Sequence, residues 1–213
     1  MKLYPKIPGS NKIPNKPCIA FEKYDGSNLR FEWSKKRGFY KFGTRRRLFD
    51  ESDIHLGKSV PIFMKTYSEN LTKILVDNKR FRGAENVIVF AEFFGKESFA
   101  GQHKLNDPTL ELILFDVSVH KFGFLGPRDF IKIFEDVKIA RKIYEGKPNG
   151  QFLENVRNSK FDVPRNGEWD IMEGAVCKGG SGGTDLWMAK VKTYKYMEKL
   201  KEVYKDKWKE YFE

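Results

Sequence analysis

The stretch from Phe21 to Asn28, with the sequence FEKYDGSN, contains Lys23, whose position could make its amine reactive. Apolar residues lead into this stretch and alternating apolar residues lead out, which places Lys23 where two strands meet. A lysine held over a pocket and crowded by other cations loses part of its proton affinity and becomes a nucleophile. The alternative is structural: Asp-Gly between alternating strands is typical of a hairpin, and Lys23 would then be an ordinary exposed lysine.

Other charged residues occur in strand-like, apolar surroundings. Glu92 lies inside the apolar run from Asn86 to Gly95, where a carboxylate is costly unless it has a partner or lines a site. The alternative for Glu92 is a surface position at a strand end.

Lys190 and Lys192 alternate with apolar residues in the last apolar run, so both lysines are predicted on one face of a strand. Two such lysines repel each other unless an anion lies between them.

The overall charge favours an anionic partner. The formal net charge is +11 and the pI is about 9.5, with basic residues spread along the chain and one dense run at 45–47. This distribution is typical of a folded basic surface that follows phosphates. The arginines of the run follow a predicted strand, where their guanidinium groups could form bidentate hydrogen bonds to phosphate oxygens. The alternative is a solvated basic turn.

The hydrophobic pattern predicts an α+β fold. Strands are expected at 18–24, 28–34, 38–43, 86–95, 110–117, 171–178 and 186–192. Helices are expected at 60–79, 127–137 and 150–158, with a basic amphipathic helix from Tyr194 onward. Residues 1–17 contain four prolines, which predict an extended arm packed along a sheet edge. The glycine-rich segment 179–185 lacks the features of a phosphate-binding P-loop and is predicted to be a hairpin loop.

Several other classes of protein are disfavoured. No apolar run approaches the length of a membrane span, and the first residues lack the pattern of a signal peptide. Cys18 and Cys177 are too few for a disulfide framework, and the three histidines have no spacing that suggests a metal site. We therefore expect a cytoplasmic protein that makes no membrane contact.

The order of these motifs resembles that of a known superfamily. Lys23-Tyr24-Asp25-Gly26 is followed by Glu92 in an apolar strand and by Phe115-Asp116. Glu173-Gly174-Ala175-Val176-Cys177-Lys178 and Lys190-Val191-Lys192 come last. Over residues 18–193 this order resembles the covalent nucleotidyltransferases, which include ATP-dependent DNA and RNA ligases and mRNA capping enzymes. Asn28, where DNA ligases and capping enzymes have arginine, and Thr44-Arg45 resemble RNA ligases similar to the second RNA ligase of phage T4.

The resemblance implies an architecture as well as an activity. It implies mixed, mostly antiparallel sheets that frame a nucleotide pocket, with peripheral helices, as in the ATP-grasp-like nucleotidyltransferase domain of DNA and RNA ligases. Residues 1–193 would form this adenylation domain, including the N-terminal arm, and residues 194–213 would form the basic helix packed on it. Ligases usually carry a second domain after the final lysine pair, but here we expect no OB-fold domain.

The resemblance also assigns roles to individual residues. Lys23 would attack the α-phosphate of ATP, helped by Lys190 and Lys192 as the other catalytic residues. We expect these lysines and a metal ion to lower the pKa of Lys23, since an ammonium cannot attack. Glu173 would hold the Mg²⁺ or Mn²⁺ ion. The residues expected to bind the nucleotide are Glu22, Lys23, Asn28, Arg45, Glu92 at the ribose, Phe115 stacked on adenine, Lys178 at the phosphate, Lys190 and Lys192.

The implied partner is a nucleic acid with 5′-phosphate and 3′-hydroxyl ends, and RNA is favoured over DNA. After formation of lysyl-AMP, the AMP would pass to the 5′-phosphate, and the 3′-hydroxyl would displace it. A protein partner or self-association could replace the second domain. Two alternatives stay open: a small ATP-dependent DNA ligase, and a non-catalytic basic nucleic-acid-binding domain with the same fold.

Overall fold

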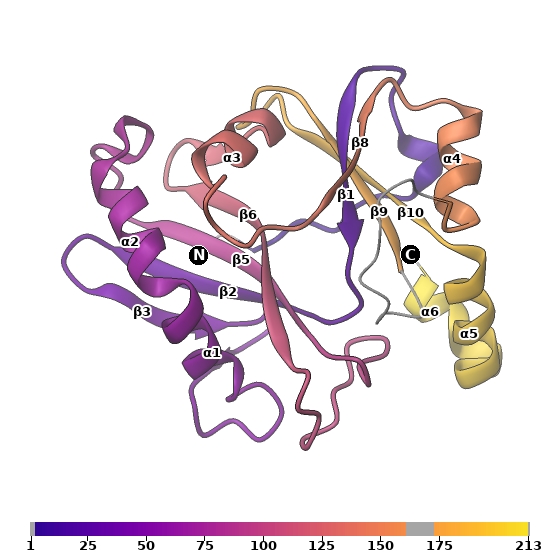
Figure 1. Cartoon of the computed structure of the whole chain (residues 1–213), viewed down its shortest axis with the longest axis horizontal. Coiled ribbons are helices and arrows are strands. Elements are labelled where there is room, and N and C mark those ends of the chain that lie inside the picture. Colours follow the sequence, from indigo (N-terminus) through magenta and orange to yellow (C-terminus); the bar gives the residue numbers. More distant parts are fainter. Residues whose placement is uncertain (1–2, 161–172, 213) are drawn as a thin grey trace.

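Two β-sheets form the frame of the chain in the computed structural model, which describes residues 3–160 and 173–212 (Figure 1). The four-stranded sheet has the order β10 (Trp187–Lys192), β9 (Gly174–Gly179), β1 (Cys18–Lys23) and β8 (Lys142–Gly146). The six-stranded sheet has the order β4 (Leu48–Phe49), β3 (Gly38–Gly43), β2 (Ser27–Ser34), β5 (Val87–Phe94), β6 (Glu111–Val119) and β7 (Gly123–Phe124). Within the described residues, all pairings between these strands are antiparallel, which confirms the α+β fold class.

The segment after Lys23 crosses from one sheet to the other. Since β1 belongs to the four-stranded sheet and β2 to the six-stranded sheet, Asp25-Gly26 is not the turn of a hairpin. A Cβ atom at Gly26 would lie 2.2 Å from the carbonyl oxygen of Phe93, so the crossing passes against β5 too closely for a side chain. The hairpin interpretation of this stretch was wrong, because pairing with distant strands decides which sheet each strand joins.

One face of the six-stranded sheet carries the main core. Leu29, Phe31 and Trp33 alternate along β2 and are buried, as the period of two predicts. The helices beside this sheet are α1 (Ser59–Thr66), α2 (Ser68–Asp77) and α3 (Pro127–Ile133) (Figure 1). Phe63 of α1 stacks on Phe31 with a centroid distance of 3.7 Å, so the helix is fixed against the middle of the sheet.

The second sheet packs against helices of its own. Its smaller core joins strand residues such as Ala20, Cys177 and Val191 to Phe152 of α4 (Gly150–Arg157). The chain then ends in α5 (Tyr194–Tyr204), a short 3₁₀ turn (Lys205–Lys207) and α6 (Trp208–Phe212). Among the described residues, no helix is both long and apolar enough to cross a membrane.

The N-terminal arm lies along a sheet edge, as predicted. The backbone N–H of Lys190 in β10 donates to the carbonyl oxygen of Pro8, so the arm covers the free edge of that strand. The arm contains one short 3₁₀ helix (Ser10–Lys12), and is otherwise irregular from Leu3 to Pro17.

Several element boundaries differ from the sequence prediction. The single helix expected at 60–79 is two helices separated at Tyr67, whose hydroxyl donates to the carbonyl oxygens of Leu112 and Lys138. The C-terminal helix breaks at Lys205, which has a φ of +46°. Strands β4, β7 and β8 were not predicted. Residues 171–172 of the predicted strand 171–178 lie outside the described residues.

Candidate active site

A cavity of about 280 Å³ lies where the two sheets approach each other, and the crossing segment forms part of its wall. Its lining residues are Tyr4, Ile7, Phe21, Glu22, Lys23, Tyr24, Gly26, Asn28, Glu92, Phe115, Ala140, Val176 and Lys178. Six of the nine predicted nucleotide-binding residues therefore line one cavity: Glu22, Lys23, Asn28, Glu92, Phe115 and Lys178. The other three, Arg45, Lys190 and Lys192, lie outside this lining.

Lys23, Glu173 and Lys192 form a chain of charges. Lys23 Nζ lies 2.5 Å from Glu173 Oε2, and Lys192 Nζ lies 3.1 Å from Glu173 Oε1. Strand pairing explains this arrangement, since both lysines pair in register with Gly174, the residue after Glu173. A Cβ atom at Gly174 would lie 1.9 Å from the carbonyl oxygen of Val191, so only glycine allows this approach. Glu173 is thus an anion between two lysines.

The charges around Lys23 correct one expectation. Burial lowers the pKa of Lys23, but the nearby charges of Glu173 and Glu92, the hydrogen bond to Glu173 and the charge of Asp25 outweigh burial. The pKa of Lys23 is therefore raised above its ordinary value, whereas we expected it to be lowered. The two lysines, conversely, hold the pKa of Glu173 below its ordinary value although burial opposes this.

Glu92 lies in the cavity wall on strand β5. It lies opposite Asn28 in the pairing of β2 with β5, so both side chains reach the cavity from adjacent strands. Burial, with Glu173 and Asp25 as further causes, raises the pKa of Glu92 to about 8 although Lys23 lowers it. The sequence prediction that this carboxylate lines a site is consistent with its place in the cavity wall.

At another part of the cavity wall, Phe115 and Lys178 lie together. Phe115 occupies an irregularity in the pairing of β5 with β6, where a bulge turns a side chain away from the regular alternation. Lys178 of β9 donates to the carbonyl oxygen of Phe115 at 2.7 Å and to Asp116 Oδ2 at 2.8 Å. Its ammonium is almost fully buried, so this buried ion pair joins the two sheets beside the cavity.

Glu22 and the arginine run have partners in several other parts of the chain. Glu22 Oε2 lies 3.0 Å from a guanidinium nitrogen of Arg141. Arg45 donates two hydrogen bonds, of 3.1 and 2.6 Å, to the carbonyl oxygen of Tyr4 in the arm. The turn that carries the arginines is ordered, because Thr44 Oγ1 accepts from the backbone N–H groups of the next two arginines.

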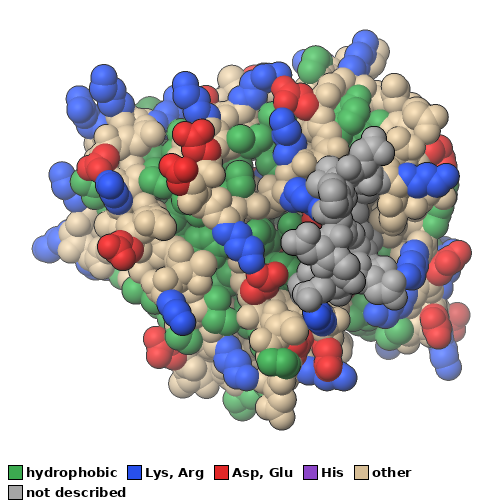
Figure 2. Space-filling view, viewed as in Figure 1, with side chains coloured by type: hydrophobic (Ala, Val, Ile, Leu, Met, Phe, Trp, Pro, Cys, Tyr) green, Lys and Arg blue, Asp and Glu red, His purple; other side chains and the backbone are tan. Residues whose placement is uncertain are grey.

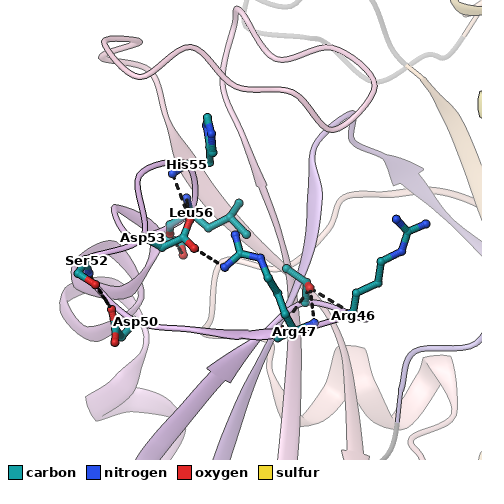
Figure 3. Close-up of polar contacts among 9 residues, drawn as sticks. Arg46, Arg47, Asp50, Ser52, Asp53, His55 and Leu56 are labelled. Carbon is teal, nitrogen blue, oxygen red and sulfur yellow. Dashed lines mark hydrogen bonds and ion pairs between the residues drawn. The ribbon is translucent and has the colours of Figure 1, made fainter.

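Figure 3 shows that the next two side chains of this turn diverge. Arg47 forms an ion pair with Asp53, whose carboxylate also accepts from the backbone N–H groups of His55 and Leu56. Arg46 extends away from this pair and is exposed. The three arginines of the run therefore have different surroundings. Arg45 contacts the arm, Arg47 pairs with Asp53 in the following loop, and Arg46 projects from the turn. More widely, Lys and Arg side chains are spread over the face in Figure 2.

Comparison with known proteins decides the family. The model of the RNA ligase family matches residues 16–196, which is most of the chain. The chain belongs to the RNA ligase family. A search of curated proteins found no match.

Among solved structures, this family member is similar to RNA ligases from Naegleria gruberi. One is bound to PPi, with a TM-score of 0.63 and 16% identity over 95% of this chain and 58% of that chain. Another, a mutant bound to ATP and Mn, has a TM-score of 0.63 and 17% identity over 93% of this chain and 58% of that chain. This chain therefore spans less than two thirds of the length of these proteins, and at this identity the similarity establishes the fold.

The described side chains of this RNA ligase family member do not form a metal site by themselves. Within residues 3–160 and 173–212, no group of three or more His, Cys, Asp or Glu side chains could hold a metal ion. Mg²⁺ sites at phosphates often use only one or two carboxylates, with water and phosphate oxygens as the other ligands. Glu173 is one such carboxylate beside the cavity wall, which agrees with a site completed by ATP.

Two features of the site were missed from the sequence. Tyr4 and Ile7 of the arm line the cavity, but a proline-rich segment has no periodicity that points inward. Asp25 was noted only as part of a motif. Its carboxylate accepts from the Ala100 N–H at 2.9 and 3.1 Å and from the Tyr196 hydroxyl at 3.0 Å. Burial raises the pKa of Asp25 to about 6, and the neighbouring Glu173 adds to this.

Proposed function

We propose that this chain is an ATP-dependent RNA ligase that acts through a lysyl-AMP intermediate on Lys23. The supporting observation is the position of Lys23 Nζ: it lies on the wall of a cavity lined by Phe115 and Glu92, and it contacts Glu173 at 2.5 Å. A domain that only binds nucleic acid has no need for a lysine amine, an aromatic ring and buried carboxylates around one cavity. Membership of the RNA ligase family favours RNA over DNA as the substrate.

In the first step, Lys23 Nζ attacks the α-phosphorus of ATP. A P–N bond forms, the bond from this phosphorus to the bridging oxygen of pyrophosphate breaks, and pyrophosphate leaves. The attacking nitrogen must be neutral. Its proton is directed at Glu173 Oε2 in the observed hydrogen bond, so loss of this proton is coupled to the charge of Glu173.

The surrounding residues stabilise the charge of the reaction. Lys192 and Lys190, at the end of β10, offer positive charge to the α-phosphate oxygens in the transition state. Glu173 would hold a divalent metal ion, and such an ion supplies positive charge to phosphate oxygens. Phe115 offers its ring to adenine and Glu92 its carboxylate to the ribose hydroxyls. Lys178 lies beside Phe115 and would contact the nucleotide phosphate.

The later steps use the same pocket with a nucleic acid. An oxygen of the 5′-phosphate attacks the phosphorus of lysyl-AMP, and the P–N bond to Lys23 breaks. The 3′-hydroxyl then attacks the 5′-phosphorus, and AMP leaves as the phosphodiester forms. We assign Asn28, which lines the cavity with Lys23, and Arg45, at the turn after β3, to these steps. A protein partner or self-association would supply additional contacts to the strand.

Intact mass spectrometry after incubation with ATP and Mg²⁺ or Mn²⁺ tests the first step. We expect one AMP adduct per chain, labile to acid and stable to alkali, as for a phosphoramidate. The adduct is expected to be absent in Lys23→Ala and present in Lys36→Ala, a control lysine in the exposed turn between β2 and β3. No adduct on the wild-type protein, or an unchanged adduct on Lys23→Ala, would contradict the proposal.

A second assay separates the enzyme classes. Nicked duplexes that differ only in ribose or deoxyribose on the 3′-hydroxyl side should be sealed with a preference for ribose. A preference for deoxyribose would support the DNA ligase alternative. Labelling by GTP in preference to ATP would instead indicate a capping-type guanylyltransferase.

A further inference from the structure

The side chain of Tyr196 contacts Lys192, at one end of this chain of charges, and Asp25, close to Lys23 in the sequence. Its hydroxyl donates to Asp25 Oδ1 at 3.0 Å, two residues after Lys23. Its ring lies under Lys192 Nζ, with 5.0 Å between this nitrogen and the ring centroid. Tyr196 is only 2% exposed, so both contacts are made away from bulk water. One residue of the C-terminal helix therefore reaches both strand β10 and the crossing segment that follows Lys23.

The local sequence fixes Tyr196 in this position. Thr193 caps α5, since its Oγ1 accepts from the backbone N–H of Tyr196 at 3.1 Å. The backbone N–H of Thr193 donates in turn to the carbonyl oxygen of Glu173 at 3.0 Å. Because Thr193 is the N-cap of α5, the first turn of this helix is anchored to Glu173, the residue that binds both Lys23 and Lys192.

Asp25 is held from its other side by a constrained loop. The Ala100 N–H donates to both carboxylate oxygens, and Ala100 has a φ of +51°, which is uncommon for a residue with a Cβ atom. Such a conformation persists where the surroundings fix it. Phe99 packs on Tyr196 with a centroid distance of 5.6 Å, so the loop and α5 support each other. Asp25 is thus clamped between two elements far apart in the sequence.

We propose that Tyr196 is a positioning residue of the adenylation reaction, which acts on Lys23 through Asp25. The inference rests on the proposed function. Residues 24–26 of the crossing segment belong to neither sheet, so strand pairing does not fix their path, and the hydrogen bonds of Asp25 help to hold it. Asp25 holds the segment through hydrogen bonds to Ala100 and Tyr196, and α5 contributes the Tyr196 hydroxyl to these contacts. Without it, Lys23 Nζ samples positions away from the line of attack on the α-phosphorus.

The test is the single-turnover rate of AMP adduct formation over a range of ATP concentrations. Tyr196→Phe removes only the hydroxyl and keeps the ring under Lys192. We expect the maximal rate to fall about tenfold, as for loss of one hydrogen bond to a charged group, with the half-saturating ATP concentration unchanged. The matched control is Tyr194→Phe, on the same helix but 41% exposed, which should keep the wild-type rate. Thermal unfolding of each variant monitors the fold.

A double-mutant cycle with Asp25→Asn distinguishes positioning from general loosening. If Tyr196 acts through Asp25, the double mutant is no slower than the slower single mutant, whereas independent defects multiply. A wild-type maximal rate in Tyr196→Phe, or multiplied defects in the double mutant, would overturn this inference while leaving the proposed function intact. No adduct on the wild-type protein would overturn the proposed function and this inference together.

Discussion

Lys23 Nζ and Glu173 Oε2 lie 2.5 Å apart although 150 positions separate the two residues in the chain. Pairing of β1 with β9 brings them together, and pairing of β10 with β9 adds Lys192 to the same carboxylate. The contact has an electrostatic consequence. With Glu92 and Asp25 nearby, the carboxylates keep the amine of Lys23 charged, so the proposed attack on ATP requires that this charge balance change when the nucleotide binds.

Replacement of Glu173 by glutamine should slow adduct formation strongly. The amide keeps the shape of the side chain but removes the negative charge that orients both lysines and would hold the metal ion. We expect a loss of about 100-fold in the single-turnover rate, typical of one electrostatic contact in an active site. The dependence of the rate on metal concentration should also weaken. Unaltered labelling, relative to the exposed control Glu198→Gln, would contradict both assigned roles.

Glu92 should make the stability of the fold depend on pH. Burial raises its pKa to about 8 in the folded state, against 4.5 ordinarily. Its contribution to the free energy of unfolding is therefore fully present below about pH 4.5 and is lost as the pH rises through 8. The loss has an upper bound of about 5 kcal/mol, and partial exposure of Glu92 will reduce it.

Urea unfolding of wild-type protein and Glu92→Gln between pH 5 and pH 9 measures this effect. The glutamine cannot ionise, so the stability of the variant relative to wild type should increase with pH. A difference between the two proteins that stays constant over this range would show that Glu92 titrates normally.

Arg46 and Arg47 should behave differently despite their adjacent positions. Arg46 projects from the turn, so Arg46→Ala should weaken binding of a nicked RNA duplex and reduce the slope of log affinity against log salt by about one. Arg47→Ala should instead lower the melting temperature at pH 7, because Asp53 loses its ion pair. The pKa of Asp53, lowered to about 2 chiefly by the hydrogen bond from Arg47, places this stabilisation above pH 4. Equal salt slopes for Arg46→Ala and wild type would exclude a phosphate contact.

The sequence was most informative where a pattern is local. The alternation of Leu29, Phe31 and Trp33 predicts β2, and the structure buries all three residues. Candidate site residues could also be found, because Glu92 is a carboxylate in an apolar strand and the order of the motifs pointed to Lys23 and Glu173. Their roles remain predictions, but Lys23, Glu92 and Glu173 do lie around one place, as the ordered motifs indicated.

Long-range contacts account for what the sequence did not predict. The division of β1 and β2 between two sheets depends on pairing with β8 and β9, which residues 21–28 do not encode. The break at Tyr67 depends on carbonyl oxygens 45 and 71 positions away. The sequence pattern did not single out Tyr196 within the C-terminal helix, because its hydrogen bond to Asp25 spans 171 positions.

The arm contributes a buried tyrosine to the cavity wall. The Tyr4 hydroxyl donates to Asp116 Oδ2 at 2.8 Å, the oxygen that also binds Lys178, and the Tyr4 ring meets Phe115 edge-on at 5.1 Å. Its carbonyl oxygen accepts from Arg45. Tyr4 therefore supports Phe115, Lys178 and Arg45, three residues that the sequence analysis assigned to nucleotide binding.

Two substitutions of Tyr4 should separate the contribution of its hydroxyl from that of its ring. Tyr4→Phe removes one buried hydrogen bond and should lower the free energy of unfolding by about 1 kcal/mol, with little change in the ATP concentration that half-saturates adduct formation. Tyr4→Ala also removes the ring, so we expect a loss of about 3–5 kcal/mol and a several-fold higher half-saturating ATP concentration, because Phe115 loses its support. Tyr40→Phe is the matched control, since its hydroxyl donates to Asn86 away from the cavity wall. Wild-type half-saturation in a folded Tyr4→Ala protein would show that the arm plays no part in nucleotide binding.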